Sequence, residues 1–91
     1  MNKQVILKIY GRVQMVMFRD FVQRKAKKLD LLGWVRNQDD SAVKVVAEGE
    51  EKNLKELIDL CYNGSILSRV DKIEIEWREA TGGFDKFKIQ Y

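Results

Sequence analysis

The chain has 91 residues, a net charge of +3, and 45% hydrophobic and 34% charged residues. This length fits one domain with one modest core, and the composition is too apolar for a disordered chain and too evenly charged for a membrane span. Histidine is absent and Cys61 is the single cysteine, which excludes an internal disulfide framework, a cysteine-rich zinc site and the most usual general base. We expect one domain over residues 1–91. Because Met1–Gln4 lack the apolar stretch of a secretory signal, we also expect a cytoplasmic protein without a membrane partner.

The charges are unevenly distributed along the chain. Basic side chains outnumber acidic ones in residues 1–44, and the reverse holds in residues 45–91. An anionic ligand bound by the N-terminal half, a nucleic-acid surface and a solvated helix face would each give this asymmetry. Charge alone therefore leaves all three interpretations open.

Alternating apolar side chains predict a first strand over residues 4–10, ended by Gly11. From Phe18 the apolar spacing takes the period of a helix. This predicts an amphipathic helix that ends near Leu32, because Gly33 is a good helix terminator.

The rest of the chain predicts a hairpin, a second helix and two further strands. The hairpin has a polar turn at its centre, and the second helix begins at acidic residues, which its dipole favours, and ends at an Asn-Gly pair. The apolar stripe of this helix is formed by Leu54, Leu57, Ile58 and Cys61. In chain order, these elements are strands over residues 34–37 and 43–48 joined by residues 38–42, a helix from Gly49 to Gly64, and strands over residues 70–77 and 84–91.

This order of elements predicts an α+β fold, the ferredoxin-like sandwich of two split β-α-β units. We expect an antiparallel sheet with two helices on one face, in which strand 4–10 lies beside strand 43–48 and the final strand forms an extra edge. Because this fold hosts many unrelated functions, function must be argued from particular residues.

The most informative segment joins the first strand to the first helix and reads Gly11-Arg12-Val13-Gln14-Met15-Val16-Met17-Phe18-Arg19. Successive backbone N–H groups in such a loop, followed by a helix N-terminus, can form an anion-binding concavity. Arg19, in the first helical turn, can add a planar set of donors that matches phosphate oxygens. Neither feature is specific by itself, since such junctions are common and an arginine on a helix surface is usually solvated.

Asn37, at the end of the short strand 34–37, has two interpretations. An asparagine at this point is often a turn residue, and spacing alone favours that interpretation. Its amide can instead hold a water molecule, because it both donates and accepts hydrogen bonds.

Together these segments resemble the acylphosphatase family. That family has a Gly-Arg-Val-Gln-Gly-Val-x-Phe-Arg loop, which looks like residues 11–19 with one exception, and a Gly-x-Val-x-Asn segment, which looks like residues 33–37. Residues 43–49 are similar to the strand that follows in the family, and residues 87–91 are similar to its C-terminal Phe-x-Ile-x-Tyr. The likeness covers nearly the whole chain, in order and at compatible spacing.

The resemblance implies hydrolysis of the carboxyl-phosphate bond of an acyl phosphate to a carboxylate and inorganic phosphate, without a metal or a cofactor. It implies that Arg19 binds the phosphate and that Asn37 orients the attacking water. Because a carboxylate is a good leaving group, positioning and charge stabilisation supply most of what this reaction requires. We expect a monomer that binds these small molecules and no nucleic acid. The implied phosphate-binding loop is built from the backbone N–H groups of Arg12, Val13, Gln14, Met15, Val16, Met17 and Phe18.

Two departures from the family pattern affect the loop and the hairpin. Met15 stands where the family has its second loop glycine, and Ser41 stands where the hairpin turn has glycine. A loop that wraps its N–H groups around phosphate often needs a positive φ, which costs a residue other than glycine about 1–2 kcal/mol. Met15 therefore has two possible outcomes. Either the loop keeps its shape at a cost in stability, or it relaxes and loses donors, which lowers activity.

A second class of function remains open, namely a catalytically weak or inactive phosphate-binding module, or a nucleic-acid binder, of the same fold. The basic cluster of residues 24–28 fits nucleic acid or a solvated helix face. Ferredoxin-like RNA binders carry exposed aromatic residues on their central strands, where this chain has only Tyr10. Hydrolysis of a small acyl phosphate in the presence of a chelator separates the enzyme from the binder.

Overall fold

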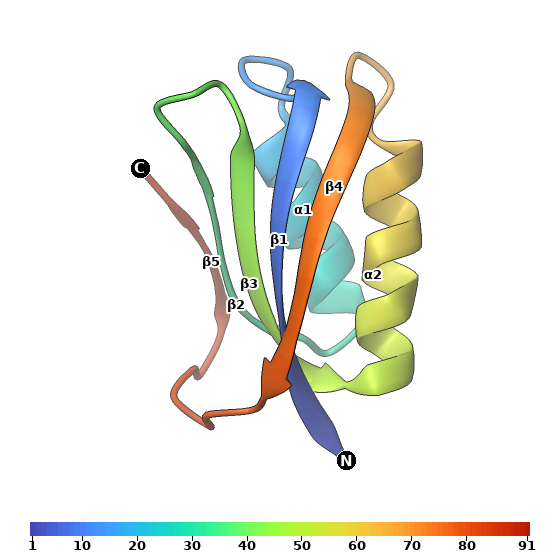
Figure 1. The fold of residues 1–91 in the computed structure, drawn as a ribbon. Helices are drawn as coiled ribbons and strands as arrows, with labels where there is room; N and C mark the ends of the chain where they lie inside the picture. Colours follow the sequence, from blue (N-terminus) through green and yellow to red (C-terminus); the bar gives the residue numbers. More distant parts are fainter.

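The predicted order of strands and helices is present in the computed structural model, which describes residues 1–91. Figure 1 shows both helices on one face of a single sheet, whose other face is open. The strands lie in the order β4-β1-β3-β2-β5. In chain order the elements are β1 (Asn2–Arg12), α1 (Phe18–Lys28), β2 (Leu32–Asn37), β3 (Val43–Glu50), α2 (Glu51–Asn63), β4 (Arg69–Glu79) and β5 (Phe87–Gln90).

The ferredoxin-like arrangement is confirmed, with one correction to the description of its sheet as antiparallel. β1 pairs antiparallel with β3, as expected, and also with β4, and β3 pairs antiparallel with β2. β5 forms an edge, as expected, but it runs parallel to β2. Residues 80–86 carry the chain from β4, at one edge, across the end of the sheet to the other edge (Figure 1), so β5 enters from the same end as β2.

The core lies between the sheet and the two helices and contains 18 buried residues. The apolar stripe predicted for the second helix is buried throughout, and that of the first helix is buried or partly buried. Burial raises the pKa of the Cys61 thiol to about 12, which makes it an inert packed side chain. Core residues from β1, α1 and α2 include Val5, Leu7, Ile9, Phe18, Val22, Ala26, Leu54, Leu57, Ile58 and Cys61.

The sequence predicts that Gly11 ends the first strand, but in the structure it does not. β1 continues to Arg12 through a bulge between Tyr10 and Gly11, and φ of Gly11 is +134°. A Cβ at this position would collide with the backbone of Arg69 in β4, so the bulge requires glycine.

Gly33 does not end the first helix either. α1 ends at Lys28, and the chain turns at Asp30, whose φ is +56°. Gly33 lies inside β2 with φ +139°, where a Cβ would collide with the carbonyl group of Val46 in β3. Its role is to allow the close approach of two strands.

The end of the sheet where β1 begins is held by the buried carboxylate of Glu48, on β3. It accepts hydrogen bonds from Nε2 of Gln4 (2.7 Å), from N–H and Oγ1 of Thr81 (2.8 Å each) and from N–H of Gly82 (3.0 Å). Burial acts to raise the pKa of Glu48, but the donors from Thr81, Gly82 and Gln4 outweigh it, so the pKa lies below its usual value. These bonds hold the connection between β4 and β5 in place.

Neither helix has the length and apolar character needed to cross a membrane. At the other end of the sheet, the loop that follows β1 and the turn between β2 and β3 lie close to each other (Figure 1). This end carries the residues singled out by the sequence.

Candidate active site

The β1–α1 loop, residues 13–17, has an unusual backbone conformation. Met15 and Met17 both have φ +60°, whereas Gln14 and Val16 have negative φ. Alternation between negative and positive φ can turn successive N–H groups toward a common centre, as in an anion-binding concavity. Met15 therefore has the backbone conformation that glycine favours, which is the one expected if the loop keeps its shape.

The backbone N–H groups of this loop are free. None of the N–H groups of residues 13–17 donates a hydrogen bond to another group of the chain. The first bond of α1 that involves the loop runs from Phe21 N–H to the carbonyl of Met17 (3.1 Å), and Met17, as the N-cap residue, makes no side-chain cap. The loop thus presents unpaired donors at the positive end of a helix dipole.

Most side chains of the predicted loop serve the fold. Arg12 is the exposed last residue of β1, Val13 and Phe18 are buried in the core, and Val16 packs partly buried against that core. Met15 and Met17 are 99% and 73% exposed. Their backbone, not their side chains, carries the donors.

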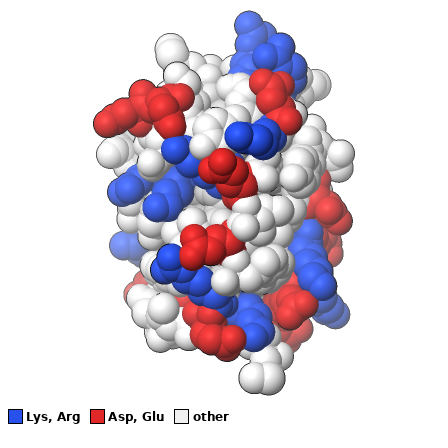
Figure 2. Space-filling model, viewed as in Figure 1, with Lys and Arg blue, Asp and Glu red and all other residues white.

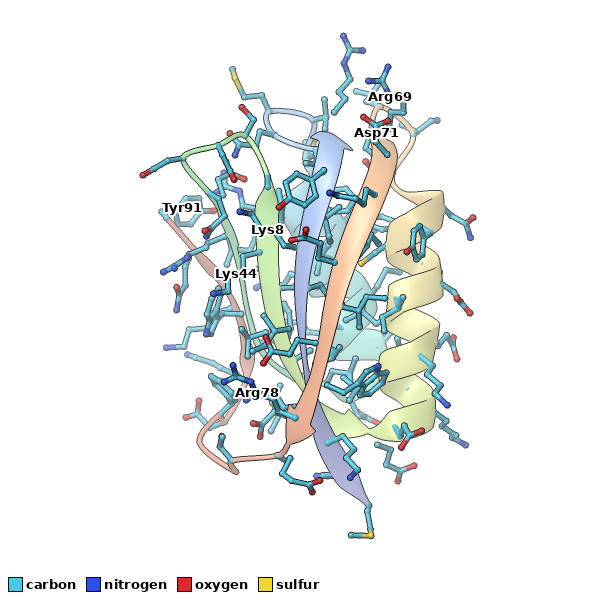
Figure 3. The ribbon with its side chains drawn as sticks, viewed as in Figure 1. Lys8, Lys44, Arg69, Asp71, Arg78 and Tyr91 are labelled. Atoms are coloured by element: carbon cyan, nitrogen blue, oxygen red, sulfur yellow. The ribbon has the colours of Figure 1, made fainter.

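Arg19 lies beside the C-terminal residues of the chain. Its Nη1 donates a long hydrogen bond to the carbonyl of Gln90 (3.4 Å), and its guanidinium lies 4.8 Å from the centre of the Tyr91 ring. Figure 3 shows Tyr91 past the end of β5. Arg19 forms no ion pair with an acidic side chain, unlike Arg24 one turn later, which pairs with Asp20. The charge of Arg19 is therefore available to an anion.

An open pocket joins Arg19 to the β1–α1 loop. Its walls are mostly apolar, and Arg19 is its one basic residue. The lining residues are Val13, Met15, Met17, Phe18, Arg19, Asp20, Ile89 and Tyr91.

Asn37 is the last residue of β2 and lies on the helix side of the sheet, as does Val35 two residues earlier. Its Oδ1 is buried and has no hydrogen-bond partner. The turn that follows is closed by other groups, namely Gln38 N–H to the Ala42 carbonyl (2.8 Å) and Ala42 N–H to Oδ1 of Asp40 (3.3 Å). Asn37 is thus not the side chain that builds the turn, and its free acceptor suits a water molecule.

Asn37 and Arg19 both lie beside the end of β5. Arg36 and Gln90 are partners in the parallel pairing of β2 with β5, so Asn37 follows directly at the point where β5 ends. Arg19 binds the carbonyl of Gln90 at this same point. The sequence assigned no function to the C-terminal residues, and in the structure Gln90 and Tyr91 contact the predicted arginine.

The side chain of Gln14 also has a role that the sequence did not show. Its Nε2 donates to the carbonyl groups of Gln38 (2.8 Å) and Ala42 (2.9 Å), so its side chain reaches from the loop to the β2–β3 turn. A sequence pattern contains no signal for this contact, because its partners lie 24 and 28 residues away.

The open face of the sheet has aromatic residues, but cations cover their rings. Nζ of Lys8 and of Lys72 lie 5.4 and 4.7 Å from the centre of the Tyr10 ring, and the guanidinium of Arg36 lies 4.9 Å from Trp34. Figure 2 shows basic and acidic side chains interspersed on this face, and Figure 3 shows Lys8 among them. This differs from the free aromatic surface on which RNA bases stack.

No group of three or more His, Cys, Asp or Glu side chains is arranged to hold a metal ion. The β2–β3 turn contains two adjacent carboxylates, Asp39 and Asp40, and Asp40 pairs with Nζ of Lys8 at 2.7 Å. The hydrogen bond from Lys8, and next that from Ala42 N–H, hold the pKa of Asp40 below its usual value. This carboxylate ties the β2–β3 turn to β1.

Comparison with known proteins agrees with this geometry. The family model described as acylphosphatase matches residues 5–89. The chain is 40% identical over 98% of its length to an acylphosphatase of Salinibacter ruber, of which it covers 94%, and 47% identical over 89% of its length to one of Bacillus licheniformis, of which it covers 90%. Among solved structures, the acylphosphatase from Bacillus subtilis matches with a TM-score of 0.94 and 40% identity, over 98% of this chain and 99% of that one. The chain therefore belongs to the acylphosphatase family.

Proposed function

We propose that the N–H groups of residues 12–18 and the side chain of Arg19 bind the phosphate of an acyl phosphate, and that Asn37 orients the water that attacks phosphorus. The family to which the chain belongs hydrolyses the carboxyl-phosphate bond of such compounds to a carboxylate and inorganic phosphate. The observation that carries the assignment of residues is the run of free N–H groups in residues 13–17, beside an arginine without an acidic partner.

The two kinds of donor suit the charge of the reacting group. Negative charge on a transferring phosphoryl group is spread over its three equatorial oxygens, so several converging donors stabilise it better than one. The positive φ of Met15 and Met17 supports this proposal, because donors fixed by the backbone need little rearrangement when the phosphate binds. The guanidinium of Arg19 adds a full charge and can bind two oxygens at once.

Asn37 supplies the acceptor that a nucleophilic water requires. Its buried Oδ1 has no partner in the chain, and an O–H group of water would satisfy it. The leaving carboxylate is weakly basic and needs no proton from the protein, which suits a chain without histidine. The residues thus act by positioning and charge stabilisation.

We further propose that residues 1–91 act as a single monomeric domain in the cytoplasm, on a small acyl phosphate and without metal, cofactor, nucleic acid or membrane. The chemistry supports this proposal, because a good leaving group and a cradle of fixed donors leave little for a metal ion to add. A catalytically inactive or nucleic-acid-binding module is the other possibility, and the covered aromatic rings of the open face do not favour it.

The test measures phosphate release from acetyl phosphate in buffer with a chelator. We expect turnover by the wild-type protein, competitive inhibition by inorganic phosphate, and near-complete loss in the Arg19→Gln variant. Arg24→Gln is the matched control, because Arg24 lies on the same helix but pairs with Asp20 and does not line the pocket. Turnover that needs added Mg²⁺, or equal turnover by Arg19→Gln and wild type, would overturn the assignment. Salt-sensitive retention on RNA without hydrolysis would support the binding module.

A further inference from the structure

The Gln14 side chain is a polar link between the β1–α1 loop and the β2–β3 turn. Its Nε2 donates hydrogen bonds to the carbonyl oxygens of Gln38 (2.8 Å) and Ala42 (2.9 Å). Both partners are acceptors only, so the amide group must face them and uses both of its protons. The remaining side chains of the loop, residues 13–17, are valine and methionine, which cannot replace this link.

The two carbonyl groups lie at the two ends of the β2–β3 turn, one residue beyond the pair of Asn37 and Val43. Gln38 follows Asn37 in the chain, and Ala42 precedes Val43, the antiparallel partner of Asn37 in β3. Gln38 N–H also donates to the Ala42 carbonyl, so the same oxygen closes the turn and accepts from Gln14. One amide group thus connects the loop with free N–H groups to the strand end that carries Asn37.

We propose that Gln14 is a positioning residue, which fixes the distance and direction between the phosphate bound by the loop and the water held by Asn37. The inference rests on the proposed function of Asn37 and of the loop. In-line attack on phosphorus requires a defined alignment of water and phosphate, and a shift of about 1 Å can cost about 10²-fold in rate. The loop and the turn belong to different parts of the chain, and the amide of Gln14 sets their separation directly.

The test is a double-mutant cycle on acetyl phosphate with Gln14→Met and Asn37→Ala. Methionine has nearly the length of glutamine but cannot donate, so Gln14→Met removes the link and little volume. We expect kcat to fall by about 10- to 100-fold, with an unchanged inhibition constant for inorganic phosphate, because the loop itself remains. In the Asn37→Ala background, Gln14→Met should have no further effect on kcat, because the residue it positions is absent.

Gln23→Met is the matched control. Nε2 of Gln23 also donates from a side chain to a backbone carbonyl, that of Phe87 (3.2 Å), but this bond ties α1 to β5 and touches neither loop nor turn. The control variant also loses a hydrogen bond from a side-chain amide to a backbone carbonyl, and it should retain kcat. Thermal unfolding of every variant is recorded, and Gln14→Asn, whose amide is too short to reach the turn, replaces Gln14→Met if the latter does not fold.

Three results would overturn this inference and leave the proposed function intact. The first is an equal fall in kcat when Gln14→Met is made in the wild-type and in the Asn37→Ala background. The second is weaker inhibition by phosphate that accounts for the whole loss of activity, and the third is an unchanged kcat in both Gln14→Met and Gln14→Asn. Full turnover by Asn37→Ala would overturn the role of Asn37 and this inference with it. That outcome is distinct, because it is seen before Gln14 is changed.

Discussion

Replacing Met15 by glycine is expected to raise the free energy of unfolding by about 1 kcal/mol and to keep or raise turnover. Met15 has φ +60°, in the left-handed region that glycine adopts without strain. Its side chain is 99% exposed, so the substitution removes no buried contact. Because the loop already has the conformation that glycine would take, the N–H groups keep their directions.

The magnitude follows from two opposing contributions. Relief of the left-handed strain contributes about 1–2 kcal/mol to the folded state. The greater freedom of glycine in the unfolded chain offsets about 0.4–1 kcal/mol of this. The remainder of about 1 kcal/mol corresponds to a rise in Tm of about 4–8 °C for a domain of this size.

The assay pairs thermal unfolding with steady-state kinetics on acetyl phosphate, and Met15→Ala is the control. Alanine removes the long thioether but retains a Cβ at positive φ, so its Tm should stay near that of the wild-type protein. A rise in Tm that is as large in Met15→Ala as in Met15→Gly would show that strain is not the cause. A Met15→Gly variant that is both less stable and less active would show that the loop is built around methionine, and would refute the reasoning.

Three further substitutions have expected outcomes. Asn37→Ala should lower kcat on acetyl phosphate with little change in Tm, because Oδ1 of Asn37 has no partner in the fold to lose. Ser41→Gly should raise the free energy of unfolding in urea by up to about 1 kcal/mol, because Ser41 is exposed and has φ +73°. Glu48→Gln should lower the free energy of unfolding at pH 7 by about 1–3 kcal/mol, because one of the two acceptor oxygens becomes an NH₂ group, which cannot accept the bond from Thr81 or from Gly82. Since the pKa of folded Glu48 lies below its usual 4.5, this stability is present above pH 4.5 and is lost as the pH falls through the folded pKa, so wild type and variant should converge in urea titrations in acid.

Each of these predictions has a result that contradicts it. A large fall in the Tm of Asn37→Ala would show that Asn37 has a structural role in the turn. A Ser41→Gly variant less stable than wild type would mean that the serine side chain contributes more than its strain costs. A constant difference between Glu48→Gln and wild type from pH 7 down to acid pH would mean that the charge of Glu48 does not matter.

The core could be predicted from the sequence because helical periodicity depends only on which side chains face the sheet. Leu54, Leu57, Ile58 and Cys61 share one side of α2 and are buried as predicted. The direction of β5 could not be predicted in this way, because the apolar pattern of a short strand is the same in parallel and in antiparallel pairing. That direction depends on the connection after β4, which Glu48 holds through Thr81 from 33 residues away.

The loop and Arg19 could be located from their spacing and from the family resemblance, but their surroundings could not. The positive φ at Met15 is the one expected for a glycine position, whereas Met17, where the family motif allows any residue, has the same φ without a sequence signal. The contact of Arg19 with Gln90 joins residues 71 positions apart, and that of Gln14 with Gln38 joins residues 24 positions apart. Contacts of this range depend on the sheet register, which is fixed only by the complete fold.

The most direct test of the central claim, that residues 12–18 and Arg19 bind phosphate, is a titration of ¹⁵N-labelled protein with inorganic phosphate, in which the amide chemical shifts are followed. We predict saturable shifts that are largest for the amides of residues 13–19, with a dissociation constant equal to the inhibition constant for acetyl phosphate hydrolysis, and loss of these shifts in Arg19→Gln. Saturable shifts centred on the open face of the sheet around Lys8, or none in the β1–α1 loop, would contradict the account.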